Sequence, residues 1–309
     1  MVVQDVRRVT MPGQVDPPFK RRELENAVTL CSEHGACTAT LTLGASTVGL
    51  SGPQRLFAEP TAADPVSHAV WVRTLPAPFD GSIDPAWLED AFAANRSGVP
   101  DVLALAMQYT HGAPAIHDGV LQIAGEAGYG PLRGGKRQEG SDFNDYLGVT
   151  WTYPDDRVDA PEPGQFRCLD CSGFMRMIWG YRHNLAGFGY VDNIALCLDA
   201  SEDRSAMPRR ANEIYASGPG VVVIEDEDAP VVDLSPLAVG DLLFFNADAA
   251  DGARLDHVGM YLGIDDGGHH RFISSRKGHN GPTLGDVRGR SILNGTGLYA
   301  KTFRAARRL

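Results

Sequence analysis

Residues 166–179 read FRCLDCSGFMRMIW, a polar turn that runs directly into an apolar helical pattern. Phe174, Ile178 and Tyr181 recur at positions i, i+4 and i+7, which places them on one face of a helix. Asp170 is a residue type that caps helix N-termini, so the helix is predicted to begin at Cys171. This stretch therefore predicts a helix whose first residue is a cysteine and whose apolar face packs on a core.

The position of Cys171 predicts a chemical role for its thiol. Free backbone N–H groups and the helix dipole favour an anion at a helix N-terminus, and they lower the pKa of a thiol there toward neutrality. A thiolate is a nucleophile, and a cysteine nucleophile works with a base, which is usually a histidine. The fold should therefore bring a histidine close to Cys171.

Length and composition indicate a globular protein with a sizeable core. The chain has 309 residues, of which 43% are hydrophobic and 22% charged, and it has no apolar run long enough to span a bilayer. Its net charge of −11 argues against nucleic acid or an anionic membrane as the main partner. Residues 1–8 lack the apolar segment of a secretory signal, so the protein is expected either to stay inside the cell or to have lost a leader.

The cysteine count is odd, which leaves at least one free thiol and argues against a disulfide scaffold. Cys31 and Cys37 could form a bridge in an oxidising compartment, or they could be two unrelated thiols. The sequence leaves both interpretations open.

Cys168 and Cys171 have the CxxC spacing of a redox pair or of half a zinc site. A redox pair is typical of a βαβ context near the start of a domain, which is absent here. Zinc would need further ligands, and only the adjacent His269 and His270 offer a pair. Cys168 is therefore expected to be a packed thiol, with a reversible disulfide to Cys171 as a further hypothesis.

The chain divides into an N-terminal accessory region, residues 1–98, and a second domain, residues 99–309. No chemical motif occurs in the first region. Its predicted elements are a helix over 21–34, strands over 38–43 and 68–75, and a helix that begins at Pro85 behind the N-cap Asp84.

The second domain is predicted to be α+β, because helices come first and a run of short strands follows. Helices are predicted over 101–109, 120–127 and 206–217, and strands over 221–225, 241–246, 256–263, 271–276 and 301–305. The strands predict an antiparallel sheet on which the Cys171 helix packs. Residues 130–159 are too polar and irregular for a core, and their aromatic side chains predict one wall of a substrate groove.

His257 is the strongest candidate for the base among nine histidines. It opens the predicted strand HVGMYLG, residues 257–263, which follows the strand GDLLFF, residues 240–245. A histidine at the start of a buried strand that faces a helix N-terminus gives the arrangement of cysteine hydrolases. Six other histidines have no such context: His34, His68, His111, His117, His183 and His279.

Three motifs in this order resemble the successive signatures of the NlpC family of papain-like cysteine peptidases: DCSGF at 170–174, GDLLFF at 240–245 and HVGMYLG at 257–263. Members of this family cut the peptide stems of bacterial cell-wall peptidoglycan, and the resemblance covers residues 99–309. It implies a papain-like core, Cys171 as the nucleophile, His257 as the general base, and neither cofactor nor metal. It also implies a secreted or wall-associated protein that cuts a γ-D-glutamyl–diamino acid bond.

The family usually carries a third polar residue, most often histidine, on the strand after the base. This chain has FISS at 272–275, so Ser274 takes that place. A two-residue turn at Asp266-Gly267 would set Arg276 opposite His257 and make Ser274 its diagonal neighbour. Ser274 is therefore the predicted orienting residue, with a histidine (His269 or His270) or a backbone carbonyl as alternatives.

The resemblance also implies substrate contacts. Asp170 and Ser172 flank the nucleophile, and Tyr129 begins the segment YGPLRGG, which loosely resembles a Pro-Tyr-x-x-Gly-Gly-like segment of the family. In the family this segment closely precedes the cysteine, whereas here a longer stretch follows it. That difference predicts an insertion that reshapes the groove.

Two other classes of function stay open. Papain-like cores with cysteine and histidine also serve amidases, acyltransferases and transglutaminase-like enzymes, so the reaction can differ while the site is kept. Because the third position is a serine, a second alternative is a non-catalytic module that binds wall fragments. An intact Cys171/His257 pair favours the hydrolase.

Overall fold

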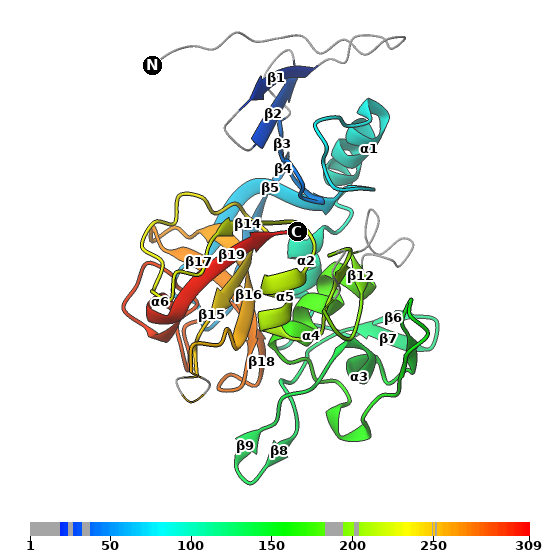
Figure 1. Cartoon of the computed structure of the whole chain (residues 1–309), viewed down its shortest axis with the longest axis vertical. Coiled ribbons are helices and arrows are strands. Elements are labelled where there is room, and N and C mark those ends of the chain that lie inside the picture. Colours follow the sequence, from blue (N-terminus) through cyan, green and yellow to red (C-terminus); the bar gives the residue numbers. More distant parts are fainter. Residues whose placement is uncertain are drawn as a thin grey trace.

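The protein is described by a computed structural model over residues 19–23, 27–32, 38–182, 194–200, 204–248, 250 and 252–309. It is a mixed α/β protein with two main antiparallel sheets (Figure 1). Among the described residues, no helix has the length and apolar character needed to cross a membrane. Cys37 lies outside the described residues, so a bridge to Cys31 stays a prediction, and His34 and His183 lie outside them as well.

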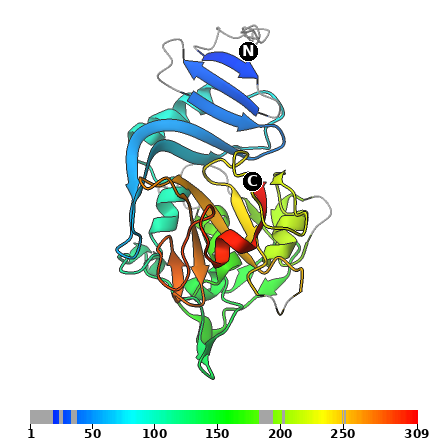
Figure 2. The same ribbon diagram turned by 90° about the vertical axis from the view of Figure 1, so that its left-hand side faces the viewer.

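The N-terminal strands form one antiparallel sheet in sequence order. They are β1 (Phe19–Glu23), β2 (Ala27–Ser32), β3 (Thr38–Thr42), β4 (Thr47–Phe57) and β5 (Val66–Thr74). Figure 2 shows these blue strands as a curved sheet at one end of the molecule. The helix predicted over 21–34 is wrong, because the described residues of this segment belong to β1 and β2. Val28 and Leu30 point into the core of this sheet, and Thr29 lies between them. This alternation of every second residue is typical of a strand.

Helix α1 (Pro85–Arg96) covers one face of this sheet and confirms the predicted cap, since Asp84 accepts a hydrogen bond of 2.9 Å from the N–H of Ala86. Leu88 and Phe92 pack there against the sheet in a core formed by residues between 28 and 92. Three residues of β4 and β5 belong to the main core of the molecule instead: Phe57, Val66 and Val72.

The second sheet has the order β14-β19-β15-β16-β17-β18 and is antiparallel at every step. Its strands are β14 (Val221–Ile224), β15 (Leu242–Phe245), β16 (His257–Ile264), β17 (His270–Arg276), β18 (Gly281–Thr283) and β19 (Phe303–Arg308). Helix α6 (Leu298–Thr302) leads into β19. The predicted antiparallel sheet is confirmed.

Helix α4 (Cys171–Arg176) packs on β16 and β17 and continues as a π-helical turn, η2 (Met177–Tyr181). Phe174 and Ile178 share one buried core with Val258 and Met260 of β16. The predicted helix and its packing on the sheet are therefore confirmed.

The segments between the two sheets are short helices and hairpins. They are α2 (Val102–Met107), β6 (Ile116–Asp118), β7 (Leu121–Ala124), β8 (Leu132–Arg133), β9 (Lys136–Arg137), α3 (Phe143–Leu147), β10 (Trp151–Thr152), β11 (Val158–Asp159), the 3-10 turn η1 (Pro163–Gln165), β12 (Ala195–Leu196), β13 (Ala206–Met207) and α5 (Ala211–Ser217). The helix predicted over 120–127 is wrong, because β7 pairs with β6 there. The helix predicted to start at 206 begins only at Ala211.

The sequence predicted that residues 130–159 lie outside the core. The structure shows that part of this segment is buried. Phe143 and Tyr146 of α3 are fully buried in the main core, and Tyr153 is nearly so. The polar residues around them fold into turns and caps that allow these aromatic side chains to pack.

Candidate active site

Cys171 is the first residue of α4, as predicted. The Asp170 carboxylate caps the helix by accepting a 2.8 Å hydrogen bond from the N–H of Gly173. Position 173 must be glycine, because a Cβ there would lie 2.2 Å from the carbonyl oxygen of Ser141. The tetrapeptide Asp-Cys-Ser-Gly is thus a compact cap that fixes the thiol at the end of the helix.

The Cys171 thiol lies against the backbone on both sides of His257. Its Sγ is 3.9 Å from the carbonyl oxygen of Asp256, and the N–H of Val258 also faces the sulfur. The packing of α4 on β16 therefore places the predicted nucleophile beside the backbone that carries the predicted base, although the two residues are far apart in sequence. Both residues are almost enclosed, with 6% of Cys171 and 8% of His257 exposed.

His257 faces the opposite side of the sheet from the α4 core. It pairs with Phe245 across β15 and β16, and its ring lies 5.7 Å from that of Phe245 and 5.3 Å from that of Tyr299. Its Nε2 is buried and has no hydrogen-bond partner among the described residues. A buried nitrogen without a hydrogen bond lowers the stability of the fold. Its presence therefore indicates a functional role for His257.

Ser274 lies on the same face of the sheet. A Cβ at Gly259 would be 3.1 Å from the Cβ of Ser274, so these two residues are opposite each other and His257 is the diagonal neighbour of Ser274. The Ser274 hydroxyl is fully buried and, like Nε2 of His257, has no hydrogen-bond partner in the described structure. The neighbouring Ser275 is used structurally, since its hydroxyl donates to the carbonyl of Leu169 at 2.5 Å.

The predicted register holds at this end of the hairpin, but the predicted turn is wrong. The N–H of Gly268 bonds to the carbonyl of Asp265, and Gly268 has φ +81°, so the loop is one residue longer than two. A bulge between Tyr261 and Gly263 compensates for the extra residue. Met260 therefore pairs with Ile273, as the shorter turn would have required.

Neither alternative histidine contacts His257. Nδ1 of His270 forms a 2.8 Å hydrogen bond with the Tyr261 hydroxyl, at the end of β17 that is remote from His257. Nδ1 of His269 lies 3.3 Å from the Asp265 carboxylate in the hairpin loop. On β17, Arg276 lies opposite His257 in register, and Ser274 is the diagonal neighbour of His257 on the same face.

The protonation states differ from those the sequence predicted. Burial, reinforced by the Asp170 carboxylate, raises the pKa of Cys171 to about 12, against the opposing effects of the Val258 N–H and Arg209. The prediction of a lowered thiol pKa is therefore wrong for this enclosed conformation, because desolvation outweighs the N-terminal amides of a short helix. The resting site holds a neutral thiol.

The imidazole is neutral as well. Burial lowers the pKa of His257 to about 3, and the positive charge of Arg276 acts in the same direction. Arg276 is itself buried, and its guanidinium donates to the carbonyls of Thr283 and Gly289 rather than to a carboxylate. A neutral imidazole is the form that accepts a proton from a thiol.

A buried ionic network lies directly behind Asp170, and sequence reasoning missed it. Arg209 binds both carboxylate oxygens of Asp170, at 3.2 and 2.7 Å, donates to the Ser172 hydroxyl at 2.7 Å and lies 3.4 Å from Asp142. Asp142 in turn binds Arg176 of α4 at 2.9 Å. No sequence pattern distinguishes Arg209, because it comes from a turn that only the fold brings to α4.

The network keeps Asp170 ionised. Burial acts to raise the pKa of Asp170, but Arg209 and the N–H groups of Gly173 and Gly140 hold it below its ordinary value. The polar atoms of Asp170 and Ser172 are thus occupied by Arg209 and the helix cap. A direct contact of either residue with substrate stays a prediction.

Tyr129 reaches the site by strand-like pairing. The N–H of Leu169 bonds to the carbonyl of Gly128 at 2.8 Å, which lays residues 128 and 129 beside the segment that precedes Cys171. Tyr129 is 2% exposed, its hydroxyl lies 3.4 Å from the Glu139 carboxylate, and the charge of an ionised Cys171 would act on it. The long intervening insertion therefore does not remove Tyr129 from the neighbourhood of the thiol.

The cysteine pair does not form a metal site in the described structure. Cys168 and Cys171 are both free thiols. Among the described residues, the one cluster with ligand-like spacing consists of Asp64, Asp265 and His269, and it contains no cysteine. The two-cysteine, two-histidine arrangement considered for zinc is not assembled there.

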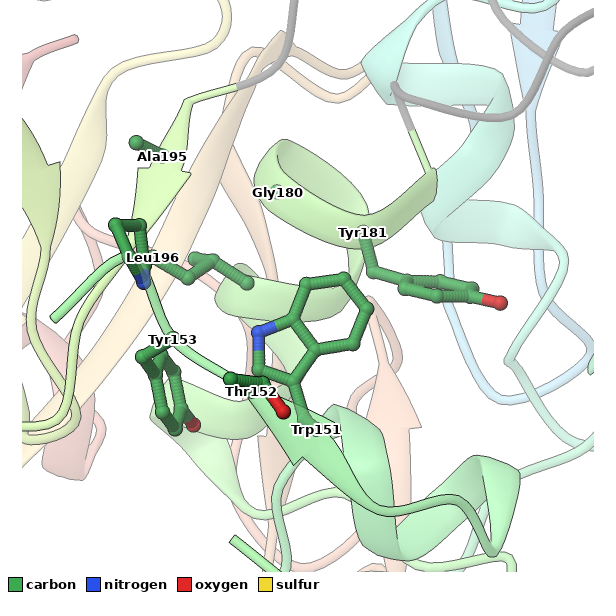
Figure 3. A pocket seen from close by; sticks show the side chains of 8 residues that line it. Trp151, Thr152, Tyr153, Gly180, Tyr181, Ala195 and Leu196 are labelled. Atoms are coloured by element: carbon green, nitrogen blue, oxygen red, sulfur yellow. The ribbon is translucent and has the colours of Figure 1, made fainter. Parts of the chain in front are cut away.

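The aromatic segment around residue 151 lines a separate hollow of about 220 Å³. Figure 3 shows Trp151 and Tyr181 on one side of it and Leu196 on another. The Trp151 and Tyr181 rings pack edge to face at 5.8 Å. Cys171 and His257 are not among its lining residues, so this segment forms a pocket of its own beside the π-helical turn.

No family model matches the chain, and no curated protein is similar to it. The candidate site therefore depends on the residues and the geometry alone.

Proposed function

We propose that the protein is a cysteine hydrolase of the NlpC type, with a papain-like core, that cuts an amide bond in the peptide stems of peptidoglycan. The observation that carries the proposal is the position of the Cys171 sulfur, at a helix N-terminus and against the backbone of Asp256 and Val258, which flank His257. A thiol packed against the strand that carries a neutral imidazole supplies a nucleophile and a base. The choice of peptidoglycan comes from the three motifs.

In this mechanism the thiol proton passes to His257 as the sulfur attacks the amide carbonyl. The N–H of Cys171, at the start of α4, helps to hold the oxyanion, and one such donor contributes about 3 kcal/mol in other enzymes. His257 then gives its proton to the leaving amine, and a thioester remains on Cys171. Water, deprotonated by His257, cleaves the thioester and regenerates the thiol, so that one amide and one water yield one acid and one amine.

Ser274 is proposed to orient His257. Its hydroxyl and Nε2 of His257 are two buried groups on one face of the sheet that have no hydrogen-bond partner among the described residues, so each has a free valence for the other or for a bridging water. A serine polarises the imidazole less than a carboxylate or a second imidazole does. We therefore expect Ser274 to hold the tautomer rather than to carry charge.

Digestion of purified muropeptides followed by mass spectrometry tests the proposal. The wild-type protein should release fragments that define the cleaved bond, and Cys171→Ala should release none. Cys168→Ala is the matched control, since it removes the neighbouring thiol and should retain cleavage. Products linked to an added amine instead of water would identify an acyltransferase, and fragments from Cys171→Ala would exclude the proposed nucleophile.

A further inference from the structure

Lys277 and Glu139 are two exposed charged residues near Cys171, whereas the other charged groups that act on the thiol, Asp170 and Arg209, are largely buried. The Lys277 ammonium lies 2.5 Å from the Glu139 carboxylate, and these side chains are 49% and 60% exposed. Both act electrostatically on Cys171. Among the described residues near the thiol, the other cation that acts on it is Arg209, which is largely buried between Asp170 and Asp142.

This ion pair joins the two sides of the site. Glu139 precedes Gly140, whose N–H bonds to the Asp170 carboxylate at 3.0 Å, on the side of the nucleophile. Lys277 follows Arg276, the last residue of β17, on the side of the base. The pair therefore forms an exposed bridge between the segment next to the nucleophile and the segment next to the base.

The pair is also easily exchanged. An ion pair this exposed contributes little to stability, because water screens both charges. The Tyr129 hydroxyl lies 3.4 Å from the same Glu139 carboxylate, so Glu139 keeps a donor when Lys277 turns away from it. An incoming carboxylate can then replace Glu139 on Lys277, while Glu139, which is 60% exposed, retains the Tyr129 hydroxyl and water as donors.

We propose that Lys277 is the specificity residue of the site and binds a free carboxylate of the substrate close to the scissile amide. Glu139 holds the Lys277 ammonium beside the thiol in the free protein and yields it to that carboxylate. The substrate class is thus an amide with a neighbouring carboxylate. The inference deepens the proposed hydrolase function and rests on it for the reaction.

The test compares two thiol reagents that differ in charge, iodoacetate and iodoacetamide, on the full-length protein. Alkylation of Cys171 is followed by mass spectrometry in the tryptic peptide Cys168–Arg176, where fragmentation separates it from Cys168. The ratio of the two rates is compared between variants. Any change in the thiol pKa affects both reagents equally, so the ratio reports the local charge.

Lys277→Met should lower the iodoacetate-to-iodoacetamide ratio by about fivefold, as expected for the loss of one nearby unit charge in a partly aqueous setting. Glu139→Gln should raise the ratio, because it frees the ammonium. Lys277→Arg should stay within about twofold of the wild type, and all of these differences should shrink at high salt. Lys301→Met, at an exposed position in α6, is the matched control and should have no effect.

An unchanged ratio in Lys277→Met, or an equal change in Lys301→Met, would overturn the proposal. The reagents need no substrate, so the result is independent of the proposed function. If muropeptides are cut and the ratio does not respond, the role of Lys277 fails alone. If the ratio responds and no muropeptide is cut, the anion-binding role stands and the peptidoglycan assignment fails.

Discussion

Two neighbouring groups of buried polar side chains in this protein are built in opposite ways. In the ionic frame of Asp142, Asp170, Arg176 and Arg209, each charged group is paired with an opposite charge and with further hydrogen bonds. In the site, Nε2 of His257 and the hydroxyl of Ser274 are buried and have no hydrogen-bond partner in the part of the chain that the structure describes. The frame is built for stability and the site is not, although the two meet at the N-terminus of α4.

The difference indicates where function resides. Unpaired buried groups are costly and persist only if the surrounding structure holds them in place. The frame holds Asp170, Asp170 caps α4, and α4 holds Cys171. We therefore expect substitutions in the site to change activity, and substitutions in the frame to change stability.

Among substitutions that keep the nucleophile, the largest effect on activity should come from His257→Gln. Loss of the general base is expected to lower kcat/KM on the order of 10² to 10⁴-fold, measured on muropeptides. The same change should improve stability in acid. The folded state holds the pKa of His257 at about 3, against an ordinary value of 6.5, so between these values the unfolded chain binds more protons and the wild type loses stability as pH falls.

Urea unfolding at several pH values measures this effect. The acid-induced loss of unfolding free energy should be smaller in His257→Gln than in the wild type. An equal loss in both proteins would show that His257 is not held neutral by the fold.

The largest effect on stability should come from Arg176→Met in the frame. Arg176 is fully buried, and its removal leaves Asp142 with one cation partner instead of two, which should lower the unfolding free energy by about 3–5 kcal/mol. The control is Arg157→Met, which breaks the ion pairs of a 41% exposed side chain with Asp155 and Asp199. That change should have little effect on the unfolding free energy because water screens these charges, and equal costs for the two variants would remove the distinction between frame and surface.

The pH dependence of Cys171 alkylation sharpens the description of the site. The thiol pKa is raised to about 12, so the thiolate fraction is small at neutral pH and grows with pH. Alkylation by iodoacetamide should therefore rise about tenfold per pH unit between about pH 7 and about pH 9, without a plateau. A plateau at or below neutral pH would indicate a preformed thiolate–imidazolium pair, as the sequence alone predicted.

The smallest effect is expected from Ser274→Ala. Removing a hydroxyl that has no partner should leave the unfolding free energy unchanged to within about 1 kcal/mol, or raise it slightly. Turnover should fall only a few fold, because serine orients the imidazole without supplying charge. A loss of activity as large as that of His257→Gln would give Ser274 a central role that its geometry does not support.

The local parts of this site could be predicted from the sequence. The cap at Asp170, the start of the helix at Cys171 and the strand that begins at His257 each depend on short-range patterns. The diagonal placement of Ser274 was also predicted, although it arises from a longer loop and a bulge that cancel each other.

The rest depends on packing that no local pattern encodes. Arg209 and Lys277 come from turns, and only the tertiary fold brings them to Cys171. The thiol pKa was predicted in the wrong direction because the helix N-terminus is visible in the sequence and the burial of the thiol is not. A helix was predicted over 21–34 because its apolar residues fit the helical period as well as the strand period. Residues 27–31 form a strand because they pair with β3.

The most direct test of the account is to look for the acyl group on Cys171. The protein is mixed rapidly with muropeptides, quenched in acid and mapped by mass spectrometry. The account predicts a stem-peptide fragment attached as a thioester to Cys171, within the peptide Cys168–Arg176, in the wild type and in Cys168→Ala but not in Cys171→Ala. Cleavage of muropeptides by Cys171→Ala, or an adduct on any other residue, would contradict it.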